Sequence, residues 1–191
     1  RWVVSAPLAR SIWAPALPKL EWIKQRTEFI DATLDAFLKD NAGAGAQVVL
    51  IGAGYDTRSL RYYGQGAQFF EVDLPSVVAG KRRLHKRWRD QLAPGAELPT
   101  CVGFDLNGYL DGASVLDALK SAGLRADAPT LFVWEAVLFY VDPDAVTALT
   151  ADTAAVGAAN PQGAAVCSTD SLKPHVPRSF THEARAWFES D

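Results

Sequence analysis

Four successive apolar segments of the sequence each end in a glycine or a carboxylate, and these residue types can hold a small polar ligand. The terminal residues are Gly52, Asp73, Asp105 and Glu135. Glycine lets the backbone turn tightly and approach a ligand closely, and a carboxylate accepts hydrogen bonds from hydroxyl or amino groups. Each residue alone is explained equally well as an ordinary solvated strand end, but the coincidence at four ends favours one binding site.

The first of these ends carries the sharpest local motif, Gly52-Ala53-Gly54, directly after the apolar run QVVLIG. A dinucleotide-binding fingerprint would place a third glycine at position 57, where this chain has Thr57. The motif therefore argues against a pyrophosphate site and leaves open a turn that serves another adenosine cofactor. The alternative is an ordinary turn from a strand into a helix.

Asp73 lies 21 positions after Gly52, at the end of the second apolar segment. An acidic residue at about this distance from the glycines is the usual ligand of a ribose hydroxyl. We therefore expect Asp73 to bind both vicinal hydroxyls of a nucleoside, with helix capping as the alternative.

Arg26 stands within the apolar stripe of the first expected helix, four residues from Trp22 and four from Ile30. A charge that faces a core needs a partner. A structural salt bridge would meet this need, and so would a ligand carboxylate held by the guanidinium fork.

The elements that position these residues alternate along the chain. We expect strands at 47–52, 67–73, 99–105, 130–135 and 164–170, and helices at 21–40, 75–92, 113–122 and 144–159, after an irregular first segment of twenty residues. Such alternation predicts an α/β fold, a mostly parallel sheet with helices on both faces. Ligands bind such sheets at the carboxyl ends of the strands, where the strand order reverses.

Length, charge and composition are typical of a single globular domain. The 191 residues correspond to a single domain, 1–191, and the net charge of −3 offers no general attraction for nucleic acid or an anionic membrane. The chain contains no methionine, which favours a fragment or a processed form. No apolar run is long enough for a membrane span.

Several other side chains are expected to be structural. We expect the basic run from Lys81 to Arg89 to form a solvated helix face, with RNA or an acidic protein as the alternative partner. The histidines have no metal-ligand spacing, so no metal site is expected. Cys101 and Cys167 lie in apolar segments and are expected in the core.

Taken in order, LIGAGYDTRSLR, FFEVDLPSVVAGKRRLH and EAVLFYVDPDAV resemble the leucine carboxyl methyltransferase family over roughly Gln25 to Val146. This resemblance implies a Rossmann-like class I methyltransferase fold and the cofactor S-adenosylmethionine. It also implies that Arg26 binds the methionine carboxylate, Gly52 and Gly54 line the methionine moiety, Asp73 holds the ribose, Asp105 and Leu106 contact adenine, and Glu135 lies near the methionine amino group.

The resulting function hypothesis is methyl transfer to a carboxylate or hydroxyl oxygen of a small molecule or a protein C-terminus, in the cytoplasm. No residue is identified as a catalytic base, and the oligomeric state is left open. Because family members continue past the fifth strand, we expect the chain to be truncated at its C-terminus. The alternatives are a non-catalytic binding or interaction module and, less favoured, a nicotinamide-dependent oxidoreductase.

Overall fold

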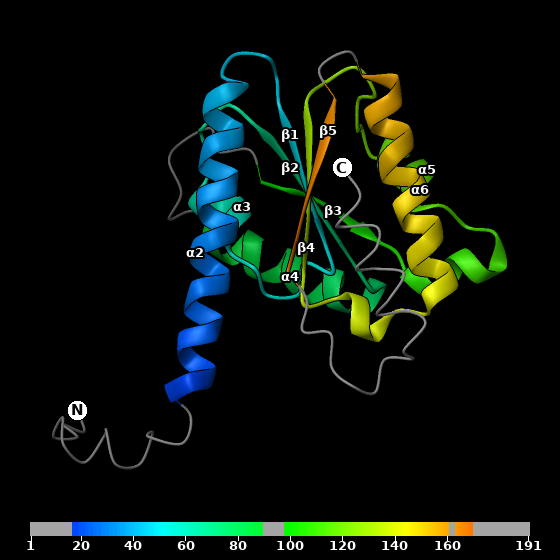
Figure 1. Ribbon diagram of the computed structural model, residues 1–191, viewed down its shortest axis with the longest axis horizontal. Helices are drawn as coiled ribbons and strands as arrows, with labels where there is room; N and C mark the ends of the chain where they lie inside the picture. Colours follow the sequence, from blue (N-terminus) through cyan, green and yellow to red (C-terminus); the bar gives the residue numbers. More distant parts are fainter. Residues whose placement is uncertain (1–16, 90–97, 161–162, 170–191) are drawn as a thin grey trace, which may run out of the picture.

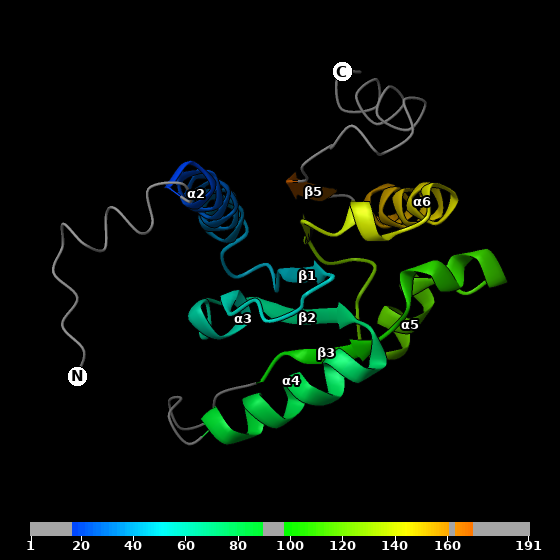
Figure 2. The same ribbon diagram turned by 90° about the horizontal axis from the view of Figure 1, so that it is seen from below.

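Five parallel strands form one sheet in the order β3–β2–β1–β4–β5 in the computed structural model, which describes residues 17–89, 98–160 and 163–169. The strands are β1 (Gln47–Ile51), β2 (Gln68–Asp73), β3 (Thr100–Gly103), β4 (Thr130–Glu135) and β5 (Ala164–Thr169). Figure 2 shows β3 and β5 at opposite edges of the sheet. The order reverses between β1 and β4, so the expected parallel sheet and its switch point are confirmed.

The central strands are mostly apolar because both of their faces are covered. Every residue of β1 is buried, and its side chains alternate between two hydrophobic clusters. Val49 and Ile51 belong to the cluster that also contains Trp134, whereas Val48 and Leu50 belong to the cluster under Ile30. This burial on both faces explains why the β1 sequence shows no polar alternation.

Helices cover both faces of the sheet. Helix α2 (Leu17–Asp40) lies on one side, and α5 (Val115–Ser121) and α6 (Pro143–Ala159) lie on the other (Figure 1). The shorter α3 (Arg58–Arg61) follows β1, and α4 (Pro75–Trp88) joins β2 to β3. Among the described helices, none is long and apolar enough to cross a membrane.

Two features of the helices differ from the sequence-based expectation. Helix α2 begins at Leu17, so the irregular first segment does not extend to residue 20. Pro18 is compatible with this start because a proline in the first turn removes no intrahelical hydrogen bond. The 3-10 helices η3 (Leu106–Asp111) and η4 (Leu138–Tyr140) were not predicted, since single turns are too short to show a periodic pattern.

Candidate functional site

A cavity of about 350 Å³ opens beside the carboxyl ends of β1 and β4. Its wall includes four of the seven predicted site residues, namely Arg26, Gly52, Gly54 and Glu135. They come from α2, the turn after β1 and the end of β4, which are distant in the sequence. The structure therefore brings together residues that the sequence analysis selected separately.

The backbone conformation of the turn after β1 favours glycine at positions 52 and 54. Gly52 and Gly54 have φ angles of +64° and +41°, in the left-handed region that other residues rarely adopt. A Cβ on Gly52 would overlap the side chain of Val137, so the turn packs directly on the segment that follows β4. A Cβ on Gly54 would meet no atom nearer than 3.9 Å, so the space beside this residue is open.

Asp73 lies directly against this turn. Its Oδ2 accepts a hydrogen bond from the Gly54 backbone N–H at 2.7 Å, and its Oδ1 accepts one from Leu74 at the same distance. Helix α4 has Leu74 as its N-cap residue and no side-chain capping bond, so the alternative of Asp73 as a helix cap is not observed. Each carboxylate oxygen keeps a further lone pair for a ligand. Asp73 does not itself line the cavity, and the ribose assignment stays a prediction.

Arg26 and Glu135 face each other in the cavity wall. The Arg26 Nε donates to Glu135 Oε1 at 2.7 Å, and both side chains are mostly buried. The Arg26 guanidinium also lies 4.7 Å from the centre of the Trp22 ring, a cation–π contact. The structure therefore shows the salt bridge that the sequence analysis considered, at a place that a ligand can reach; the carboxylate clamp stays a prediction.

Arg58 is a component of the site that the sequence analysis did not identify. It is 3 % exposed and pairs with three carboxylates: its Nε bonds to Asp31 at 2.7 Å, and its Nη1 bonds to Asp56 at 2.6 Å and to Glu135 Oε2 at 2.5 Å. Burial alone would lower the pKa of Arg58, but these carboxylates hold it above its ordinary value. The sequence signal was the position of an arginine directly after the glycine turn.

Two of the carboxylates around Arg58 are also bound by a second arginine. Burial of Asp31 alone would raise its pKa, but hydrogen bonds from Arg61 and Arg58 lower it below the ordinary value. Glu135 is held through one oxygen by Arg26 and through the other by Arg58. The cavity wall thus contains a preorganised array of alternating charges.

The two residues predicted to contact adenine lie outside the cavity. Asp105 is exposed and accepts a hydrogen bond from the Asn107 backbone at 3.0 Å, which caps η3. The Leu106 side chain is buried in the core. The register of β2 and β3 pairs Asp73 with Gly103, so Asp105 stands at the same edge of the sheet as Asp73. The adenine assignment stays a prediction.

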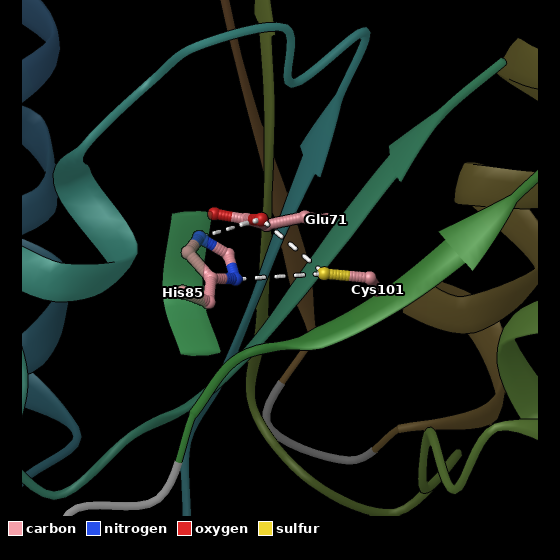
Figure 3. Close-up of side chains that lie close together, drawn as sticks. All are labelled: Glu71, His85 and Cys101. Carbon is pink, nitrogen blue, oxygen red and sulfur yellow. Dashed lines mark hydrogen bonds and ion pairs between the residues drawn. The ribbon is translucent and has the colours of Figure 1, made fainter. Parts of the chain in front are cut away.

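A second polar cluster is buried next to the turn and combines Glu71, His85 and Cys101 (Figure 3). Glu71 Oε2 lies 3.6 Å from His85 Nε2 and 3.6 Å from Cys101 Sγ. These donor types can bind a metal, but Lys81 Nζ already lies 3.0 Å from Glu71 Oε1 and compensates the charge of this carboxylate. Burial lowers the pKa of His85, and burial together with Glu71 raises the pKa of Cys101 to about 11.

The basic run of α4 is therefore not a uniformly solvated face. Lys81 and His85 point into the protein and are buried, which corrects the expectation for these two residues. Their spacing of four residues places them on one face of the helix. The intervening Arg82 and Arg83 are exposed, as expected.

The parallel sheet with its switch point and the helices on both faces define a Rossmann-like α/β protein. The model of the leucine carboxyl methyltransferase family matches residues 11–154. The chain therefore belongs to this family, and the resemblance noted from its motifs is confirmed. The cofactor of the family is S-adenosylmethionine.

Mycobacterial relatives support the same assignment. One from Mycobacterium avium, named "Putative S-adenosyl-L-methionine-dependent methyltransferase", is 34 % identical over 173 residues, which cover 86 % of this chain and 50 % of the relative. A relative of the same description from Mycobacterium tuberculosis is 32 % identical over 173 residues, covering 86 % of this chain and 45 % of the relative. The chain spans about half the length of the curated relatives it matches.

Proposed function

We propose that the protein binds S-adenosylmethionine beside the glycine turn and transfers its methyl group to an oxygen atom of an acceptor. The observation that carries this proposal is the pairing of Arg26 with Glu135 in the wall of the cavity that the glycine turn also lines. The amino-acid end of the cofactor has one carboxylate and one ammonium group, which match this guanidinium and this carboxylate. The cavity volume of about 350 Å³ is in the range of small-molecule sites.

The remaining contacts follow from the order of the strands. Asp73 accepts hydrogen bonds from the ribose hydroxyls, and its contact with Gly54 fixes its position relative to the turn. Asp105 and Leu106 contact the adenine at the end of β3. These assignments place the cofactor along the carboxyl ends of β4, β1, β2 and β3, in the order in which these strands lie in the sheet.

Methyl transfer from this cofactor requires little acid or base catalysis. The cofactor supplies a methyl group that its sulfonium already activates, so the protein's residues mainly orient the reactants and exclude water. The carboxylates that line the cavity, Asp56 and Glu135, are both paired with Arg58 and are poorly placed to remove a proton. This arrangement favours an acceptor carboxylate, which is ionised at pH 7, over a hydroxyl, which would need a base.

The acceptor on this proposal is a small-molecule carboxylate or a protein C-terminus. Transfer of a labelled methyl group by the full-length protein to a panel of carboxylates and hydroxyl compounds tests this part. Labelling confined to hydroxyl compounds would overturn the preference for a carboxylate. Binding of the cofactor without transfer to any acceptor would support the alternative of a non-catalytic module.

Calorimetric titration tests the cofactor. We expect binding of S-adenosylmethionine and none of NAD, and we expect Asp73→Ala to weaken binding about 10- to 150-fold, because a hydrogen bond to a charged group contributes about 1.5–3 kcal/mol. Asp117→Ala is a matched control, since this carboxylate is exposed on α5 at the opposite face of the sheet. Unchanged affinity of the Asp73 variant would refute the ribose assignment, and failure of the wild-type protein to bind would refute the proposed function.

A further inference from the structure

Glu71 of β2 and Lys81 of α4 form a buried ion pair against the glycine turn. The Lys81 Nζ lies 3.0 Å from Glu71 Oε1, and the two residues are 3 % and 1 % exposed. Charged residues are rarely buried to this extent without a structural or functional reason. Both side chains of this pair also bind the glycine turn or the helix that follows it.

Lys81 reaches the turn itself. Its Nζ donates a hydrogen bond to the backbone carbonyl of Ala53 at 3.2 Å, between the two glycines of the motif. The same carbonyl accepts a bond from the Asp56 backbone N–H at 2.8 Å, which closes the turn. Lys81 therefore binds the centre of the turn from the protein interior, and the residue it holds, Ala53, also lines the cavity.

Glu71 holds the segment that follows the turn. Its Oε1 accepts a hydrogen bond from the Ser59 hydroxyl at 2.5 Å, and Ser59 belongs to helix α3, which begins four residues after Gly54. The ion pair thus connects the turn, the start of α3, the strand β2 and the helix α4. These contacts are buried, because Ser59 is also inaccessible to solvent.

The turn also contacts the group expected to bind the cofactor. Next to Ala53, the Gly54 N–H donates to Asp73 at 2.7 Å, so a shift of the turn would also shift this contact. Asp73 and Glu71 stand two residues apart on β2, so one strand supports both the interior contact and the ligand contact.

Stability alone does not explain the choice of an ion pair here. Replacing a buried ion pair by apolar residues of similar volume is often neutral or stabilising, because both charges lose their hydration. An apolar pair, however, could not donate to the Ala53 carbonyl. We propose that Glu71 and Lys81 are positioning residues that hold the glycine turn in the geometry needed to bind the cofactor, an inference that rests on the proposed binding of S-adenosylmethionine.

The neighbouring residues of the cluster provide a matched control. Cys101 approaches the other oxygen of Glu71, at 3.6 Å, and none of its described contacts reaches the turn (Figure 3). Cys101→Ala therefore perturbs the same buried carboxylate from the side away from the turn. It is expected to change the stability of the protein and leave the affinity for the cofactor within twofold of the wild type.

The test variant is the double substitution Glu71→Gln with Lys81→Met. It keeps the side-chain lengths and an acceptor for Ser59, and it removes both charges together, so no unpaired charge remains buried. We expect binding of S-adenosylmethionine to weaken about tenfold, as for loss of one charge-assisted hydrogen bond. We also expect the Gly54 amide proton to exchange with solvent about tenfold faster in the unliganded protein, with a small change in the midpoint of urea unfolding.

Wild-type affinity and unchanged exchange of the Gly54 amide in the folded double variant would overturn the proposal. Ser59→Ala gives a second test in which the ion pair itself is kept, and about threefold faster exchange of this amide is expected; an unchanged rate would also overturn it. If the wild-type protein fails to bind S-adenosylmethionine, the proposed function is refuted, and the exchange measurements still decide whether the ion pair holds the turn.

Discussion

Arg58 joins three carboxylates from three parts of the chain, so its replacement by lysine tests whether the guanidinium geometry organises the site. The Nε bonds to Asp31 on α2, and the Nη1 bonds to Asp56 in the turn and to Glu135 at the end of β4. Lysine keeps the charge but offers one nitrogen on a flexible stem, so it cannot reproduce contacts made by two separate guanidinium nitrogens.

The expected loss follows from the contacts that lysine cannot make. Two of the three charge-assisted bonds would be lost, and each contributes about 1.5–3 kcal/mol. The sum is an upper bound, because Asp31 retains Arg61 and Glu135 retains Arg26, and both carboxylates have partial access to water. We therefore expect Arg58→Lys to lower the free energy of unfolding by about 2–4 kcal/mol and to weaken cofactor binding through the loosened Glu135.

Urea unfolding followed by circular dichroism measures the first effect, and calorimetric titration with S-adenosylmethionine measures the second. Arg61→Lys is the matched control: it lies on the same helix, pairs with Asp31 and is half exposed, so its loss should be within about 1 kcal/mol. A loss for Arg58→Lys no larger than that of the control would refute the idea that Arg58 organises the site.

Two further predictions concern the turn and the buried cluster. Gly52→Ala should lower the free energy of unfolding by about 2–5 kcal/mol, because a left-handed φ and an overlap with Val137 both oppose a Cβ. Gly64 has a similar φ but open space around it, so Gly64→Ala should lower the free energy of unfolding by only about 1–2 kcal/mol in the same urea assay. The pKa of His85 is lower in the folded protein than in the unfolded chain, because the imidazole is buried. As the pH falls, the unfolded chain therefore takes up the proton first. The stability that depends on neutral His85 is complete above about pH 6.5 and is lost below it. His85→Gln should therefore flatten the decline of the urea midpoint between pH 6.5 and 5, and an unchanged decline would contradict this assignment. The titratable and charged groups that face this imidazole are Glu71, Lys81 and Cys101.

The sheet was predictable because its strands are buried on both faces. The stretches 48–51 and 131–134 inside β1 and β4 are apolar throughout, and the structure places both strands at the centre of the sheet. The 3-10 turns after β3 and β4 were not predictable in the same way. They are set by local contacts such as the Asp105 side chain on the Asn107 N–H, which leave no periodic pattern in the sequence.

Site residues that end a strand could be predicted from the sequence. Site residues whose role depends on partners far away in the sequence could not. Gly52 and Glu135 could be found because each ends a recognisable strand. Arg58 binds residues 27 and 77 positions away, and only the folded chain shows that these carboxylates converge on it. Lys81 could not be distinguished from the other basic residues of its run, because its burial depends on the ion pair with Glu71 of β2.

The ion pair between Arg26 and Glu135 balances the charges in the cavity wall and is suited to a zwitterion. The two groups neutralise each other at 2.7 Å. On the proposed binding mode, a ligand carboxylate takes the guanidinium and a ligand ammonium takes Glu135 Oε1, so the number of contacts between opposite charges is maintained. Arg58 keeps Oε2 of Glu135 in place during this exchange. On this proposed binding mode, a ligand with only one of the two charges would leave Arg26 without a carboxylate or Glu135 Oε1 without a cation, at a cost of about 1–3 kcal/mol. We therefore expect the cavity to favour the intact amino-acid end of the cofactor.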